Sequence, residues 1–137
     1  MAISPSKGAL DVGIVTTNLE AMKAFYVDSL NFREVSSSPL PGIGTIERLG
    51  FGSSILRLMA FEEEPPHSSP DALRDATGFR FLTIAVDDID EAFDACTSAG
   101  VHVVGPPSPL GPTLMSVLAQ DPDGNWIEFI TEVSSTA

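Results

Sequence analysis

The sequence contains few cysteine, histidine and aromatic residues. Among its 137 residues are one cysteine and two histidines, and aromatic residues make up 7%. A single cysteine excludes an internal disulfide. Cys96 lies in line with Ile89 and Ala92 on the apolar stripe of a predicted helix, so we expect it to pack in the core rather than act as a nucleophile. The scarcity of aromatic rings disfavours stacking against large planar ligands.

Basic residues are also scarce. Seven lysines and arginines stand against nineteen acidic residues, which gives a net charge of −12. This charge opposes approach to nucleic acid phosphates and to anionic membranes, so neither is an expected partner. Apolar runs such as residues 55–61 are too short to span a bilayer, and the N-terminal residues lack the apolar core of a signal peptide. We therefore expect a cytoplasmic protein.

What the chain does contain is an internal repeat. A strand-like run at residues 11–15 is followed by the start of a predicted helix at 18–22. The same pattern recurs at residues 81–85 and 88–92. In each copy an Asn or Asp stands where a helix N-cap is expected, at Asn18 and at Asp88. The two predicted helices end in the same way, at residues that tolerate a left-handed turn, which are Asn31 and Gly100, and each is followed by a new extended run. The sequence is therefore two copies of one module.

Turn and strand signals divide the chain into module one (about 8–61), an acidic and proline-rich connector (62–78) and module two (about 79–132). The length and 43% hydrophobic content suit one domain over residues 1–137. The predicted elements are a strand at 11–15, a helix at 18–30, Ser/Pro/Gly-rich turns, strands at 44–49 and 53–61, a helical turn around 71–75, a strand at 80–86, a helix at 88–99, and strands at 101–104, 113–119 and 126–131.

Alternation along these strands assigns side chains to two faces. One face should pack under the helices and carries Val12, Ile14, Leu82, Ile84, Ile127 and Phe129. The other is the candidate cavity wall and carries Asp11, Gly13, Val15, Ile55, Arg57, Met59, Phe81, Thr83, Ala85, Trp126, Glu128 and Ile130. Met115 either joins this wall or lies in the ordinary core.

Three segments give the chain a family resemblance. Residues 24–32, 86–90 and 121–129 resemble motifs of the vicinal oxygen chelate superfamily, which includes glyoxalase I, extradiol dioxygenases and bleomycin-resistance proteins. The resemblance runs from about residue 10 to residue 132. It implies an α+β fold in which two βαβββ modules form a cupped mixed sheet with helices on the outside. It also implies a homodimer.

In metal-dependent members of this superfamily, residues on the first, fourth, fifth and eighth strands hold a metal, typically His, Glu, His and Glu. The internal repeat identifies the matching positions as Asp11, Arg57, Phe81 and Glu128, of which only Glu128 fits. Phe81 has no donor atom and Arg57 brings a positive charge to the place of the cation. We therefore expect no metal cofactor. The alternative is an atypical site that recruits His67 or His102, which otherwise are solvent-facing or edge residues.

These residues suggest a protein that binds a small oxygenated organic molecule, with Ile55, Arg57, Met59, Phe81, Thr83 and Trp126 as the binding residues. As an enzyme it would be a metal-independent lyase or isomerase, in which Arg57 stabilises negative charge and Glu128 or Asp11 moves a proton. One alternative is a non-catalytic protein of the bleomycin-resistance type that sequesters a drug or metabolite. Another is a metal-dependent glyoxalase-like or dioxygenase-like enzyme with unusual ligands. In the plainest interpretation Asp11, Arg57 and Glu128 are only an internal ion-pair network.

Overall fold

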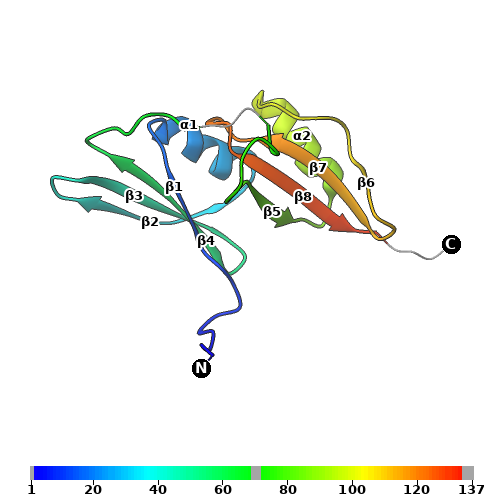
Figure 1. Ribbon diagram of the computed structural model, residues 1–137, viewed down its shortest axis with the longest axis horizontal. Helices are drawn as coiled ribbons and strands as arrows, with labels where there is room; N and C mark the ends of the chain where they lie inside the picture. Colours follow the sequence, from blue (N-terminus) through cyan, green and yellow to red (C-terminus); the bar gives the residue numbers. More distant parts are fainter. Residues whose placement is uncertain (1, 69–71, 134–137) are drawn as a thin grey trace. The chain divides into compact units, whose positions relative to one another are not determined.

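The repeat in the sequence is a repeat of structure. The computed structural model describes residues 2–68 and 72–133, which divide into two units at Pro66 and His67 (Figure 1). Each unit contains a four-stranded sheet, with strand order β1-β4-β3-β2 in the first and β5-β8-β7-β6 in the second. The elements are β1 (Val12–Val15), α1 (Leu19–Ala24), η1 (Phe25–Ser29), β2 (Arg33–Leu40), β3 (Gly44–Phe51), β4 (Ser54–Phe61), β5 (Phe81–Ala85), α2 (Ile89–Ala99), β6 (Ser108–Leu110), β7 (Leu114–Gln120) and β8 (Trp126–Glu132).

The same pairing pattern builds both sheets. In the first, β1 lies parallel to β4, and β4, β3 and β2 continue as antiparallel neighbours. In the second, β5 lies parallel to β8, and β8, β7 and β6 are antiparallel. Helix α1 packs against β4, and α2 packs against β7 and β8 (Figure 1). The predicted α+β class with two βαβββ modules is confirmed.

Strand alternation produces the predicted core in each unit. Residues assigned to the helix side are half-buried at Val12, Ile14 and Leu82. They are buried at Ile84, Ile127 and Phe129. The predicted core position of Cys96 is confirmed too, because its side chain is fully buried. Burial raises the pKa of this thiol to about 11, so it is protonated and unreactive at neutral pH.

The first helix changes its winding partway along. After Ala24 the chain continues as the π-helix η1, in which the amide of Leu30 donates to the carbonyl of Phe25 at 3.0 Å. The rings of Phe25, Tyr26 and Phe32 meet edge to face, with centroids 5.2 and 5.3 Å apart along the series. The helical segment ends at Ser29, and just beyond it Asn31 has a left-handed φ of 63°, as Gly100 has a φ of 77° after α2. Both predicted helix ends are therefore confirmed.

The two predicted N-caps behave differently. The Asp88 side chain accepts hydrogen bonds from the amides of Asp90 and Glu91, so its predicted capping role is confirmed. The prediction for Asn18 is wrong, because its side chain caps no amide. Asn18 has a ψ of 51° rather than the extended conformation of an N-cap, and its own amide donates to the Thr16 hydroxyl at 2.9 Å.

Two edge segments also differ from the prediction. The extended run predicted after Asn31 is strand β2, but it reaches Leu40 and so includes residues that were interpreted as Ser/Pro/Gly-rich turns. This strand lies at the edge of its sheet beside β3, and its serines do not alternate with apolar residues. Residues 101–104, expected as a strand, make only an isolated bridge between Val103 and Ala119. Pairing resumes in β6 after two consecutive prolines, which have no amide proton for a ladder.

In the connector, the predicted helical turn at 71–75 begins at Asp71, which lies outside the described residues. Ala72 and Asp75 form a hydrogen-bonded turn, in which the amide of Asp75 donates to the carbonyl of Ala72 at 3.1 Å. None of the helices in the described part of the chain is long and apolar enough to cross a membrane.

The two caps give a matched pair of variants. We expect Asp88→Ala to lower the free energy of unfolding of the second unit by about 1 kcal/mol, because two amides lose their acceptor. Asn18→Ala, at the equivalent position of the repeat, should have little effect because its side chain caps nothing. Urea unfolding followed by fluorescence of Trp126, the only tryptophan, reports on the second unit. Equal effects of the two substitutions would contradict this assignment.

Candidate functional site

Each sheet has a far face, which we define as the face that points away from the helix of its own unit. On the first sheet Gly13 lies beside Arg57, and Val15 beside Met59. On the second sheet the side-by-side pairs are Phe81 with Trp126, Thr83 with Glu128, and Ala85 with Ile130. Within each unit, the structure therefore brings together the residues predicted to share a face. The four positions equated with metal ligands are divided between the units, with Asp11 and Arg57 in the first and Phe81 and Glu128 in the second.

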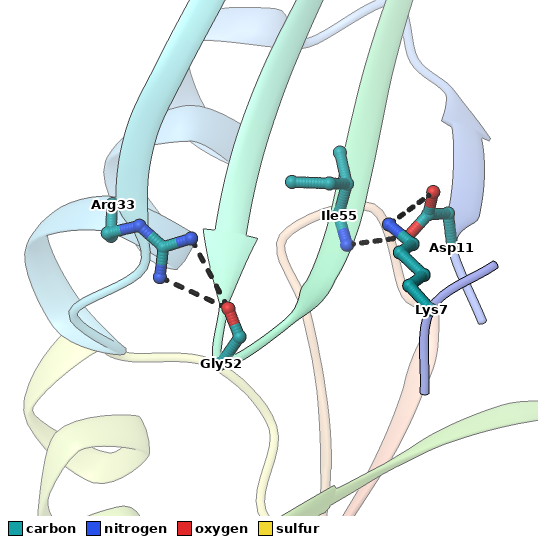
Figure 2. A network of polar contacts seen from close by, with 5 residues as sticks. All are labelled: Lys7, Asp11, Arg33, Gly52 and Ile55. Carbon is teal, nitrogen blue, oxygen red and sulfur yellow. Dashed lines mark hydrogen bonds and ion pairs between the residues drawn. The ribbon is translucent and has the colours of Figure 1, made fainter. Parts of the chain in front are cut away.

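Asp11 precedes β1 and is held by two partners. Figure 2 shows its carboxylate accepting hydrogen bonds from the Lys7 ammonium at 2.8 Å and from the amide of Ile55 at 2.9 Å. The hydrogen bond from Lys7 and then that from Ile55 hold the pKa of Asp11 below its usual value, and the charge of Arg57 adds a smaller effect. The expected ion pair between Asp11 and Arg57 is absent from the described residues, because Lys7 takes its place.

Arg57 stands in the middle of β4 with an exposed side chain. Its cross-strand neighbours are Gly13 on β1 and Arg48 on β3. Its guanidinium makes no hydrogen bond or ion pair with any residue that the structure describes. Arg57 is therefore available to a ligand as far as its own sheet is concerned.

Arg48 was not singled out by the sequence analysis, although it shares the far face with Arg57. Its Nη1 donates to the hydroxyls of Ser38 at 3.0 Å and Ser36 at 3.3 Å. A signal was present in the sequence, because Ile46 and Arg48 alternate with Glu47 and Leu49 in the predicted strand. The two serines gave no such signal, since their segment was interpreted as turns.

On the second sheet, Glu128 is half-buried and accepts a hydrogen bond from the Thr83 hydroxyl at 3.0 Å. Phe81 is 49% exposed. Trp126 is buried, and its indole Nε1 has no hydrogen-bond partner among the described residues. The exposed ring of His102 contacts the indole edge to face, with centroids 6.1 Å apart. This face thus combines one carboxylate with an aromatic surface.

The turn before β8 fixes where Trp126 and Glu128 lie. The Asp121 carboxylate accepts hydrogen bonds from the amides of Asp123 at 3.0 Å and Asn125 at 2.9 Å. The Asn125 side chain donates to the same carboxylate at 2.9 Å. Gly124 takes a φ of 89°, which favours glycine. The predicted turn at 121–125 is therefore a rigid entry into the strand.

The residues present do not fit the divalent metal that the superfamily often holds. Asp11 is engaged by Lys7 and Ile55, Arg57 is a cation, and Phe81 has no donor atom. Within residues 2–68 and 72–133, no three His, Cys, Asp or Glu side chains form a group that could hold a metal ion. His67 and His102 are exposed and join no such group.

The contact between Lys7 and Asp11 predicts a change in acid titration. Lys7→Met should raise the pKa of Asp11 toward its ordinary value of 3.8, because the largest cause of its lowering is removed. A lowered pKa stabilises the fold above the unfolded pKa, and this stabilisation is lost as the pH falls through the folded pKa. Acid unfolding of Lys7→Met should therefore start at higher pH.

Carbon-13 NMR titration of the Asp11 carboxyl carbon measures this shift. The control is Lys23→Met, which removes a lysine that is paired instead with Glu34 and Glu47. An unchanged pKa of Asp11 in Lys7→Met would show that the ion pair does not form in solution.

Comparison with solved structures shows the same fold in several glyoxalase relatives. A glyoxalase family protein from Bacillus cereus matches with a TM-score of 0.79 and 19% identity, covering 96% of this chain and 100% of its own. A glyoxylase/bleomycin resistance protein/dioxygenase domain from Frankia sp. matches with a TM-score of 0.76 and 15% identity, covering 96% of each chain. The trypanothione-dependent glyoxalase I of Leishmania major matches with a TM-score of 0.72 and 21% identity, covering 92% of this chain and 87% of its own.

A search of curated proteins gave no match. The family model described as Glyoxalase/Bleomycin resistance protein/Dioxygenase superfamily matches residues 9–129, nearly the whole chain. This match agrees with the two βαβββ modules seen in the structure. The chain therefore belongs to the glyoxalase/bleomycin resistance protein/dioxygenase superfamily.

Proposed function

We propose that this protein binds a small oxygenated organic molecule and that Arg57 holds a negatively charged or carbonyl oxygen of that molecule, with no metal required. The observation that carries the proposal is the guanidinium of Arg57, which is exposed on the far face of its sheet and bonded to no described residue. A guanidinium recognises carboxylate, enolate and carbonyl oxygens through its planar fork of N–H donors. Arg57 thus offers positive charge at the β4 position that corresponds to a metal ligand in metal-dependent members of the superfamily.

In the enzymatic form of this proposal, the protein is a lyase or isomerase. Arg57 stabilises negative charge that develops on a substrate oxygen, and a carboxylate accepts a proton. Glu128 is favoured over Asp11 for the second role, because the lowered pKa of Asp11 makes it a weaker base. Glu128 is also oriented by the hydroxyl of Thr83. The solved relatives named glyoxalase support this form.

The second candidate is a protein that sequesters a drug or metabolite without changing it. The absence of the usual ligand set at Asp11, Arg57 and Phe81 favours it, as does the superfamily's bleomycin-resistance branch. The low aromatic content of 7% counts against a large planar drug as the ligand. A carboxylate base makes any turnover fall as the base is protonated at low pH, whereas sequestration leaves the ligand unchanged at every pH.

The central test replaces the arginine. NMR titration with a panel of hydroxy acids, 2-oxo acids and 1,3-dicarbonyl compounds should find ligands whose binding Arg57→Met weakens about tenfold or more, because a charged hydrogen-bond donor is lost. Arg74→Met, which removes the same charge from the connector, should bind as the original protein does. Proton spectra of the panel compounds show turnover, which Glu128→Gln should abolish if the protein is an enzyme. Unchanged binding by Arg57→Met would overturn the proposal.

The metal-free character has its own test. Elemental analysis of the purified protein, as isolated and after incubation with Mn, Fe, Co, Ni or Zn and desalting, should find no stoichiometric metal. The physical reason is the cation and the donor-free side chain at two of the four equivalent positions, Arg57 and Phe81. One metal ion per chain would contradict this expectation and favour the alternative with unusual ligands.

A further inference from the structure

Charged side chains of the first sheet are sorted by face. The charged residues of its strands are Arg33, Glu34, Glu47, Arg48 and Arg57. Register and alternation assign the three arginines to the far face and the two glutamates to the helix side. The whole chain has only seven lysines and arginines. Three of them on one sheet face are therefore a concentration of positive charge in an otherwise acidic protein.

The two carboxylates in the strands of this sheet, and that of Asp11 before β1, already have partners. The Lys23 ammonium on α1 lies 2.9 Å from Glu34 and 3.6 Å from Glu47. Asp11 is bonded to Lys7 at 2.8 Å. Within the first unit as described, no carboxylate makes an ion pair with Arg48 or Arg57.

Arg48 and Arg57 are direct cross-strand partners. They lie opposite each other in the antiparallel pairing of β3 with β4. Side chains in such a pair start about 5 Å apart at Cβ, and like charges at this separation destabilise the sheet. Arg33 differs, because its guanidinium donates to the carbonyl of Gly52 at 3.3 Å (Figure 2). In the described part of the first unit, the pair formed by Arg48 and Arg57 thus has no carboxylate in ion-pair contact, and Asp11 acts on Arg57 only through a small electrostatic effect.

The pair of Arg48 and Arg57 also has hydrogen-bond donors and space for a negatively charged ligand. Only Nη1 of Arg48 is bonded, to the hydroxyls of Ser36 and Ser38, so its Nε and Nη2 have no partner among the described residues. Each serine hydroxyl that accepts from Arg48 keeps a proton to donate. On the other side of Arg57 stands Gly13, where an added Cβ would meet no atom within 4 Å. The far-face row that runs from Gly13 on β1 through Arg57 and Arg48 to the serines of β2 therefore offers several hydrogen-bond donors. No side chain at Gly13 competes with a ligand for them.

We propose that Arg48 and Arg57 together form a binding site for a doubly charged oxyanion, which is the phosphate of a phosphate ester or the two carboxylates of a dicarboxylate. This inference rests on the proposed function and narrows its ligand class from any oxygenated molecule to a dianionic one. Two guanidinium groups match two negative charges, and each can donate two parallel hydrogen bonds to a pair of oxygens on a carboxylate or a phosphate. The net charge of −12 does not prevent binding, because at physiological ionic strength distant charges are screened beyond about 8 Å.

The test is an NMR titration of the full chain with malonate, inorganic phosphate and, as a singly charged probe, acetate. Malonate or phosphate should shift the amides of residues 13, 48 and 57, and acetate should bind at least about tenfold more weakly. Arg48→Met and Arg57→Met should each weaken binding by about tenfold or more, since each removes a charged donor. Arg74→Met should leave it unchanged. If malonate binds more tightly, the ligand class is a dicarboxylate, and if phosphate binds more tightly, it is a phosphate ester.

A second variant keeps both arginines and so guards against a folding defect. Gly13→Glu puts a carboxylate beside Arg57 at a position that has room for it. It should compete with the ligand and weaken dianion binding by about tenfold or more. Gly105→Glu adds the same charge in the second unit, also where a Cβ meets nothing within 4 Å, and should have little effect.

Failure of this inference differs from failure of the proposed function. If Arg57→Met abolishes binding while Arg48→Met and Gly13→Glu leave it intact, Arg57 still holds the ligand but the paired site does not exist. If neither dianion binds while the uncharged carbonyl compounds of the panel do, the ligand class is wrong and the proposed function stands. If Arg57→Met binds every probe as the original protein does, both are overturned.

Discussion

The parallel pairing of β1 with β4 and of β5 with β8 determines most of what each unit presents on its far face. A parallel pair aligns side chains of the same alternation phase, so one strand from the start of a module and one from its end contribute to a single surface. The register then sets the neighbours, with Gly13 beside Arg57 and Thr83 beside Glu128. The two units share this framework, and their difference lies in the side chains that occupy equivalent positions.

The two units differ at these positions in the charge of the side chain and in whether a neighbouring side chain is hydrogen-bonded to it. In the second unit the Thr83 hydroxyl donates to Glu128, so the carboxylate is oriented by its neighbour on the next strand. In the first unit the equivalent neighbour of Arg57 is Gly13, which has no side chain to offer. At equivalent positions of the duplicated backbone, the second unit therefore has a carboxylate, Glu128, that is hydrogen-bonded to its neighbour. The first unit has a guanidinium, Arg57, that is hydrogen-bonded to no described residue. An exposed guanidinium remains hydrated until an oxyanion replaces the water, which is the state that the proposed binding role of Arg57 requires.

Local signals in the sequence were sufficient for the modules, the faces and the helix ends. Left-handed conformation at Asn31 and Gly100 follows from residue type, and the capping by Asp88 follows from its place before an apolar periodic run. The failures have tertiary causes. Strand β2 owes its pairing to β3 and not to its own serine-rich composition. The partnership of Lys7 with Asp11 depends on how the segment before β1 folds back, which no spacing rule gives. The family motifs identify the fold, whereas Arg48 and Arg57, on which the proposed ligand binding rests, lie outside those motifs.

The contact between Lys7 and Asp11 has a consequence for Arg57 that extends beyond the titration of one carboxyl group. The charge of Arg57 acts on Asp11, but Asp11 is bonded to Lys7 and to the amide of Ile55 and makes no ion pair with Arg57 among the described residues. If Asp11 paired with Arg57 instead, a ligand oxyanion would have to displace a covalently tethered carboxylate, which is present at high effective concentration. By engaging Asp11, Lys7 keeps this carboxylate from pairing with Arg57. In the site that we propose, Lys7 is therefore a positioning residue, which leaves the positive charge of Arg57 to a ligand oxyanion.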